Sequence, residues 1–128
     1  MNLSLIVKGL VHVIGSAIGL APSVGQPAPQ AADVPALLTY KPTSQADAFN
    51  HLEKLHAALG TVDPADTQTI GKIFVAIGGL VEGFFPLYQQ EGVFLIDVGN
   101  AIIQGKGDVG PIRVGNLGLT VTVAPWKS

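Results

Sequence analysis

The first twenty residues of the chain are mostly apolar, with polar residues recurring among them at helical spacing. A helix has 3.6 residues per turn, so residues three or four apart share one face. Leu10 and Ile14 fall on a broad apolar face, opposite a narrow polar stripe. We therefore predict an amphipathic helix over residues 1–20. Its polar stripe comprises Ser4, Lys8, His12, Ser16 and Gly19.

Prolines are concentrated in residues 21–42, which hold five of the nine prolines in the chain. Proline fixes φ and lacks an amide donor, so the pattern favours an extended linker over a helix or a central strand. At about 3 Å per residue, such a linker could reach roughly 60 Å. We therefore expect residues 1–20 to be a tethered arm, residues 21–42 its linker and residues 43–128 a small domain.

The domain is predicted to begin with a helix over residues 44–59, because its apolar residues recur on one helical face. Ser44 can cap this helix, with Asp47 at the third helical position as in a variant of the capping box. Gly60 is expected to end it. The next helix follows after a short connection, and together the two predict an antiparallel helical hairpin.

The second helix of this hairpin is predicted to start at Asp63 as its cap, with Pro64 in the first position, and to stop or kink at Pro86. Between Lys72 and Glu82 it is apolar nearly all round, which is typical of a helix wrapped by a core, an oligomer or a bilayer. Two GxxxG pairs, one in this helix and one in the N-terminal helix over residues 1–20, have the spacing at which another helix can approach closely. These pairs are Gly15 with Gly19 and Gly79 with Gly83.

The last part of the chain changes from helical spacing to alternation. Residues 93–103 favour a third helix over a strand, with a stop at Gly105. Residues 111–124 then alternate apolar and polar positions around Gly115-Asn116, which predicts a β-hairpin with a two-residue turn. Because an isolated hairpin is barely stable in water, we expect it to dock on the helices or on another chain. The predicted fold class is thus mainly α, with a proline-rich N-terminal arm and a C-terminal β-hairpin.

The low content of charged residues suggests that much of the surface is covered by something other than water. Charged residues make up 12% of the chain, about half the usual share. The net charge of −2 gives no basic surface for nucleic-acid phosphates, so we expect no nucleic-acid partner. The absence of cysteine excludes disulfides and thiolate chemistry.

Candidate chemistry is sparse, and we predict neither a catalytic site nor a bound metal or cofactor. His51 and His56 are five residues apart on one helix, about 140° around it, so they cannot share a metal. We expect His51 to be solvated and His56 to lie at the edge of the core. Asp97 is expected to emerge at a helix edge, and His12 to belong to the polar stripe.

These features together predict a non-enzymatic structural subunit of a large assembly, with a virion capsid, tail or decoration protein as the leading instance. Its partners would be copies of itself and other subunits. The alternative is a small membrane-associated protein that forms pores or remodels membranes through helices 3–21 and 70–88, with lipid as its partner. The predicted interaction residues are Leu10, Ile14, Gly15, Gly19, Gly79, Gly83, Leu119 and Val121.

Overall fold

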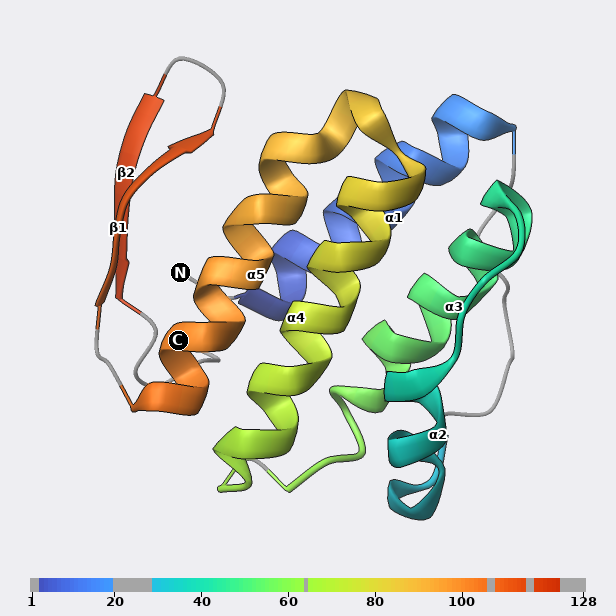
Figure 1. The fold of residues 1–128 in the computed structure, drawn as a ribbon, viewed down its shortest axis with the longest axis horizontal. Coiled ribbons are helices and arrows are strands. Elements are labelled where there is room, and N and C mark those ends of the chain that lie inside the picture. The colour runs from blue at the N-terminus through green and yellow to red at the C-terminus, as the bar shows by residue number, and fades with distance from the viewer. Residues whose placement is uncertain (1–2, 20–28, 64, 106–107, 115–116, 123–128) are drawn as a thin grey trace.

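The computed structural model describes residues 3–19, 29–63, 65–105, 108–114 and 117–122, and this part of the chain is mainly helical (Figure 1). Several of its helices pack around one buried apolar cluster. The α-helices are α1 (Leu3–Ile18), α2 (Val34–Thr39), α3 (Gln45–Ala58), α4 (Thr67–Phe84) and α5 (Gln89–Gln104). Short 3₁₀ turns, η1 (Ala31–Asp33) and η2 (Pro86–Tyr88), precede α2 and α5.

Helix α1 has the amphipathic character that the sequence predicts, but it is not a tethered arm. It crosses behind α4 and α5 and contacts α3 (Figure 1). Its apolar face enters the common core, where Val7 and Ile14 have no exposed surface. The expectation of a separate arm is wrong because this face is broad enough to complete the domain's own core.

The proline-rich segment is not extended throughout its described part. Residues 34–39 form α2, with Pro35 in its first turn, where the missing amide donor costs no helical hydrogen bond. Val34 is buried, and Leu37 and Leu38 pack against the core. The prediction of an extended linker over residues 21–42 is therefore wrong for residues 31–39. Proline disrupts the interior of a helix but is tolerated in its first turn.

Helix α3 confirms the predicted helix and its cap. The Asp47 amide donates to Ser44 Oγ at 3.1 Å. The Asp47 carboxylate reaches back to the amide of Thr43, one residue before the cap, at 3.0 Å. Because that carboxylate bonds outside the first turn, it also fixes the chain that enters α3.

Helix α4 begins later than the sequence predicts. Its N-cap is Asp66, whose carboxylate accepts from the Thr69 amide at 3.1 Å and from the Thr69 hydroxyl at 2.7 Å. Asp63 instead accepts from the Ala65 amide within the preceding turn. The two hydrogen bonds to Thr69 explain why Asp66 caps the helix. At the other end, α4 stops before Pro86, as predicted.

Helices α4 and α5 form an antiparallel pair in which glycines replace side chains along the contact. Gly71 of α4 faces Gly99 of α5, and Gly78 faces Gly92. A Cβ atom at Gly92 would lie 2.7 Å from Gly78 O, and one at Gly71 would lie 2.7 Å from Gly99 O. These distances leave no room for a methyl group, so the two backbones are in direct contact.

Glutamine side chains tie α4 to its neighbours at both ends. Gln45 of α3 donates to Phe84 O at 2.8 Å, at the end of α4. Gln68, in the first turn of α4, donates to Ile103 O of α5 at 2.9 Å. The last carbonyls of a helix have no partner within it, so each glutamine satisfies an acceptor that the helix leaves open.

The third predicted helix is confirmed as α5, which ends at Gly105 in the left-handed conformation with φ of 74°. The chain continues into strands β1 (Asp108–Val114) and β2 (Leu117–Thr122), which pair antiparallel beside α5 (Figure 1). The predicted turn at Gly115-Asn116 lies outside the described residues. The apolar face expected of a hairpin over residues 111–124 stays a prediction.

Candidate interaction surface

The outer face of α4 carries small residues that contact nothing in the described chain. Gly79 and Gly83 are exposed one turn apart, and a Cβ atom at either position would have no heavy-atom neighbour within 4 Å. The close helix contact in this region belongs instead to Gly78, one residue earlier and about 100° around the helix. Gly79 therefore has no close helix contact within the described chain. Its contact with another chain stays a prediction.

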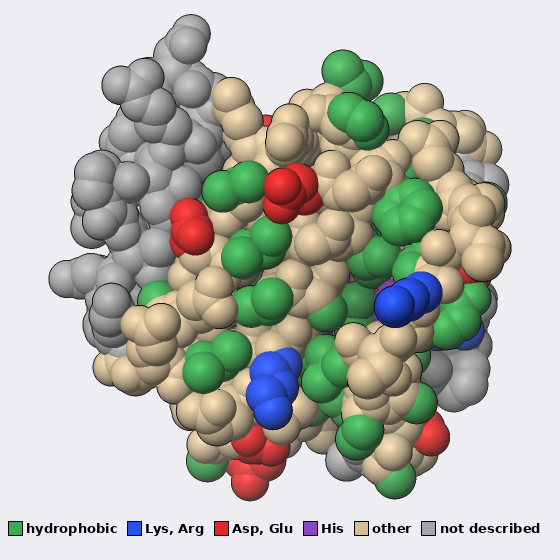
Figure 2. All heavy atoms as spheres, viewed as in Figure 1, with side chains coloured by type: hydrophobic (Ala, Val, Ile, Leu, Met, Phe, Trp, Pro, Cys, Tyr) green, Lys and Arg blue, Asp and Glu red, His purple; other side chains and the backbone are tan. Residues whose placement is uncertain are grey.

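A hollow of about 310 Å³ lies on this face, with α4 at its centre. Helix α2 borders it on one side and α5 on the other. Charged side chains are few and scattered on this side of the molecule (Figure 2). The hollow therefore presents mostly aliphatic surface to solvent. Its lining residues are Leu38, Lys72, Val75, Ala76, Asn100 and Ile103.

A second, smaller hollow of about 140 Å³ adjoins the first and shares Leu38 and Ala76 with it. It lies between α4 and the α2–α3 region, and Gly79 forms part of its lining. Tyr40 and His51 contribute its polar groups. The two hollows together make the outer face of α4 a shallow, largely apolar depression along the helix.

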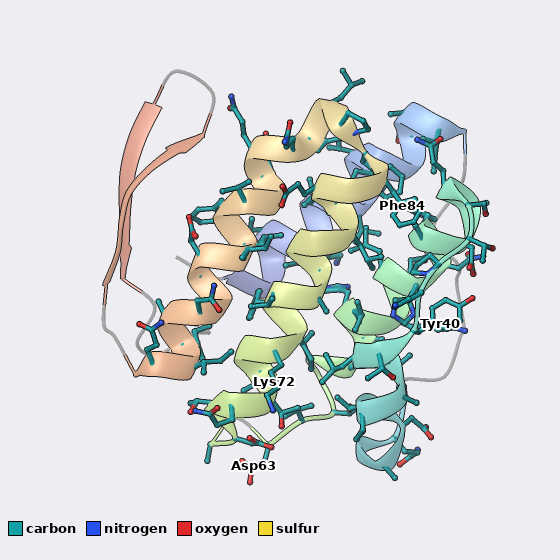
Figure 3. All side chains as sticks on the ribbon, viewed as in Figure 1. Tyr40, Asp63, Lys72 and Phe84 are labelled. Atoms are coloured by element: carbon teal, nitrogen blue, oxygen red, sulfur yellow. The ribbon has the colours of Figure 1, made fainter. Side chains whose placement is uncertain are left out.

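The polar cluster beside the second hollow joins α2 to α3 through Tyr40, Asp47 and His51. Tyr40 follows α2 (Figure 3), and its hydroxyl donates to Asp47 Oδ2 at 2.7 Å. Its ring lies 4.7 Å from the His51 ring, centroid to centroid, at a tilt of 37°. His51 Nε2 lies 2.7 Å from Leu37 O in the last turn of α2. Because that carbonyl can only accept, the Nε2 atom carries the proton of the neutral ring.

The surroundings of this cluster shift the pKa of each member. The hydrogen bond from Tyr40 lowers the pKa of the Asp47 carboxyl, and the same bond raises the pKa of the Tyr40 hydroxyl. Burial lowers the pKa of His51, and Lys54 adds to this, whereas the hydrogen bond to Leu37 O opposes it. The neutral His51 ring therefore holds the last turn of α2 against α3 through its hydrogen bond to Leu37 O. His51 is 5% exposed, so the expectation that it is solvated is wrong.

We expect His51 to make the protein less stable as the pH falls below about 6.5. Its pKa in the folded state is below the unfolded value of about 6.5. Its stabilising contribution is therefore complete above pH 6.5 and is lost as the pH falls through the folded pKa. Thermal unfolding of His51→Phe should show a smaller decrease in Tm below about pH 6.5 than the wild type.

The exposed His12 of α1 supplies the control, because His12→Phe removes a histidine from the outer surface. The decrease expected from Asp47 falls in a separate window, below about pH 4, since its lowered pKa keeps it ionised above that. An unchanged decrease of Tm below about pH 6.5 in His51→Phe would contradict the assignment of this pH dependence to His51.

The structure places the other predicted interaction residues in three different settings. Leu10, Ile14 and Gly15 are buried within the chain, so they are not available to a partner in this fold. Gly19 is exposed and follows α1 with φ of 77°, which explains the glycine at the end of this helix. Leu119 and Val121 belong to β2, opposite Ile112 and Val109 of β1. Their contact with other chains stays a prediction.

The remaining polar residues singled out in the sequence lie where they were expected. Asp97 is exposed on α5, and His12 is exposed on the polar face of α1. His56 is half-buried at the edge of the core. Across the described residues, no three His, Cys, Asp or Glu side chains gather closely enough to hold a metal ion.

The membrane alternative depends on helices that are both long and apolar. No helix among the residues that the structure describes combines the length and the hydrophobicity needed to cross a bilayer.

Sequence reasoning missed two features of the candidate surface. The glycines of the α4–α5 contact have a detectable signal, because Gly71 and Gly78 are seven residues apart, as are Gly92 and Gly99. Seven residues are close to two helical turns, so each pair lies on one face. The hollow has no such signal, since it depends on where α2 rests against α4.

Comparison with known proteins gives no further guide to this surface. No family model matches the chain. No curated protein and no solved structure matches it either.

Proposed function

We propose that this protein is a non-enzymatic structural subunit, of the kind that builds a virion capsid or tail, and that it associates with copies of itself. The outer face of α4, which carries Gly79 and Gly83, is the proposed contact. This surface carries small side chains and few charges, which favours close packing of a helix from another subunit.

The observation that carries the proposal is the contrast between two sets of glycines on one helix. Gly71 and Gly78 are accounted for by their contact with α5, where any side chain would meet backbone atoms. Gly79 and Gly83 face open space and have no positive φ, so the fold itself gives no reason for them. A glycine in a helix interior costs about 1 kcal/mol relative to alanine. A partner that approaches the α4 backbone would account for that cost.

The surface composition supports the same proposal. Only 12% of the residues are charged, which leaves little electrostatic repulsion to keep copies of the chain apart. Four large apolar side chains of the described chain are well exposed, and they lie on α1, after α2, on η2 and on α5. They are Val13, Tyr40, Leu87 and Val93.

The C-terminal hairpin would supply a second contact. Within the described residues, β2 pairs with β1 alone, so its other edge offers unpaired backbone groups. A strand from another subunit could add to this edge. An assembly that uses both surfaces could extend in two directions.

The proposal is tested by Gly79→Leu, because the new side chain enters open space in the monomer. We expect helix content and unfolding stability to stay at or above the wild-type level, while the high-mass form is lost. Sedimentation velocity and chemical denaturation measure the two properties on the same sample. The matched control is Gly9→Leu on α1, another exposed helical glycine with nothing within 4 Å of its Cβ position.

Two outcomes would count against this proposal. A wild-type chain that stays a monodisperse 13.2 kDa monomer at micromolar concentration would exclude self-assembly. Equal assembly of Gly79→Leu and Gly9→Leu would leave self-assembly intact but place the contact away from α4.

A further inference from the structure

The connection between α4 and α5 presents the most exposed large apolar side chain in the described part of the protein. Leu87, on η2, is 88% exposed. Pro86 beside it is also exposed, and Val93 of α5 is 40% exposed near the same end of the helix pair. We refer to Pro86, Leu87 and Val93 as the tip. A leucine this exposed contributes almost nothing to its own core, so its apolar surface is free for another contact.

The hollow on α4 has the properties of a receptor for such a side chain. Aliphatic groups of α2, α4 and α5 line it, and its volume of about 310 Å³ accommodates a leucine. Among the described residues that line it, only Lys72 is charged, and it projects from the first half of α4 (Figure 3). The tip has acidic neighbours, with Glu82 before it on α4 and Glu91 after it in the first turn of α5. The hollow is therefore large enough for the Leu87 side chain, and the charges beside the two surfaces are of opposite sign.

We propose that the tip of one copy, with Leu87 at its centre, docks into the α4 hollow of the next copy. This inference rests on the proposed self-assembly and specifies which surfaces meet. Leu87 contacts Leu38 and Ala76 of the neighbour, and the acidic residues beside the tip lie near the neighbour's Lys72. Gly79, next to the hollow, leaves the backbone open for the rest of the tip.

The positions of the two surfaces on one chain determine the kind of assembly. The tip follows the C-terminal end of α4, whereas the hollow lies near its residues 72–76, roughly 20 Å away at 1.5 Å per residue. A tip therefore cannot reach its own hollow. After one copy docks, its own hollow and its neighbour's tip stay open for further copies. Such a head-to-tail contact produces a ring if the rotation closes and a helical filament if it does not.

The first test changes each surface alone, at exposed positions. Leu87→Ser removes the apolar side chain of the tip, and Asn100→Trp fills the hollow from its rim with a bulky ring. We expect each variant to keep its helix content and to associate at least about tenfold more weakly than the wild type, because the leucine stays in water. Leu87→Met, which keeps an apolar side chain of similar size, should assemble like the wild type.

Mixing the two variants provides the decisive measurement. The Leu87→Ser copy keeps its hollow and the Asn100→Trp copy keeps its tip, so one productive contact remains between them. We expect a one-to-one heterodimer of twice 13.2 kDa that grows no further through this contact, detected by sedimentation velocity or native mass spectrometry.

The possible results separate this inference from the proposed function. Failure of the mixture to form a dimer, although each variant alone is monomeric, would overturn the head-to-tail contact. If Leu87→Ser assembled fully while Gly79→Leu did not, the tip would not be part of the contact. The outer face of α4 would then remain the contact, as the proposed function states. A wild-type monomer would contradict both proposals.

Discussion

Gly78→Ala is expected to destabilise the folded chain by about 1–3 kcal/mol or more, whereas Gly79→Ala should leave it unchanged or stabilise it by up to about 1 kcal/mol. The two substitutions add the same methyl group to adjacent positions of one helix. At Gly78 that methyl group would lie 2.8 Å from Ile96 N and would also collide with Gly92 O. Backbone atoms cannot move aside as a flexible side chain can, so α4 and α5 would have to separate.

Chemical denaturation of both variants measures this difference directly, with helix content at zero denaturant as a check on folding. Gly92→Ala should resemble Gly78→Ala, because its Cβ would lie 2.7 Å from Gly78 O on the other side of the same contact. Similar stability of Gly78→Ala and Gly79→Ala would mean that α4 and α5 are not in backbone contact. The prediction therefore tests the register of the helix pair as well as its distance.

This pair of glycines also marks the limit of what periodicity predicts. The sequence shows that α4 is apolar nearly all round between Lys72 and Glu82. GxxxG spacing favours Gly79 and Gly83, yet the contact inside the chain uses Gly71 and Gly78. A shift of one residue rotates a side chain by about 100°, and only the partner helix decides which face is covered. Matching seven-residue spacings on both helices would have been the better signal.

The N-terminal half shows a similar division between local and tertiary information. The amphipathic pattern of α1 was sufficient to predict the helix, and Ser44 was sufficient to predict the start of α3. The partner of α1 was not predictable, because an apolar face has the same pattern whether it meets a lipid, another subunit or its own domain. The prolines of residues 21–42 added to the error, since an extended linker implied a detached arm.

The polar cluster lay beyond sequence reasoning for a different reason. Tyr40, Asp47 and His51 are close in the chain, but their hydrogen bonds require α2 to end beside α3. An unpaired carbonyl at the end of α2 gives His51 a partner, and that partner allows burial of the ring. Without α2, the same histidine would fall on the outer face of an isolated helix. The exposure of Leu87 depends in the same way on tertiary packing.

Removal of residues 1–19 is expected to abolish cooperative unfolding, because α1 is part of the core. Val7 and Ile14 have no exposed surface, and Leu10 and Val11 are buried beside them. Each large apolar side chain contributes about 1.5–3 kcal/mol when it leaves water, and a domain of this size has a total stability of roughly 5–15 kcal/mol. Loss of four such residues, together with exposure of the surface that they cover, is comparable to the whole stability.

A milder change on α1 keeps the experiment informative if the truncated chain fails to fold. Ile14→Ala should cost about 2–5 kcal/mol, the usual range for a fully buried isoleucine, whereas Val13→Ala should be nearly neutral because Val13 is 49% exposed. Val13→Ala is thus the control for Ile14→Ala, and denaturant unfolding measures the stability of both variants. Cooperative unfolding of the chain from residue 20 onward, with the wild-type midpoint, would restore α1 as a detachable arm. In that case the apolar face of α1, including Leu10 and Ile14, would be free to bind a neighbouring subunit.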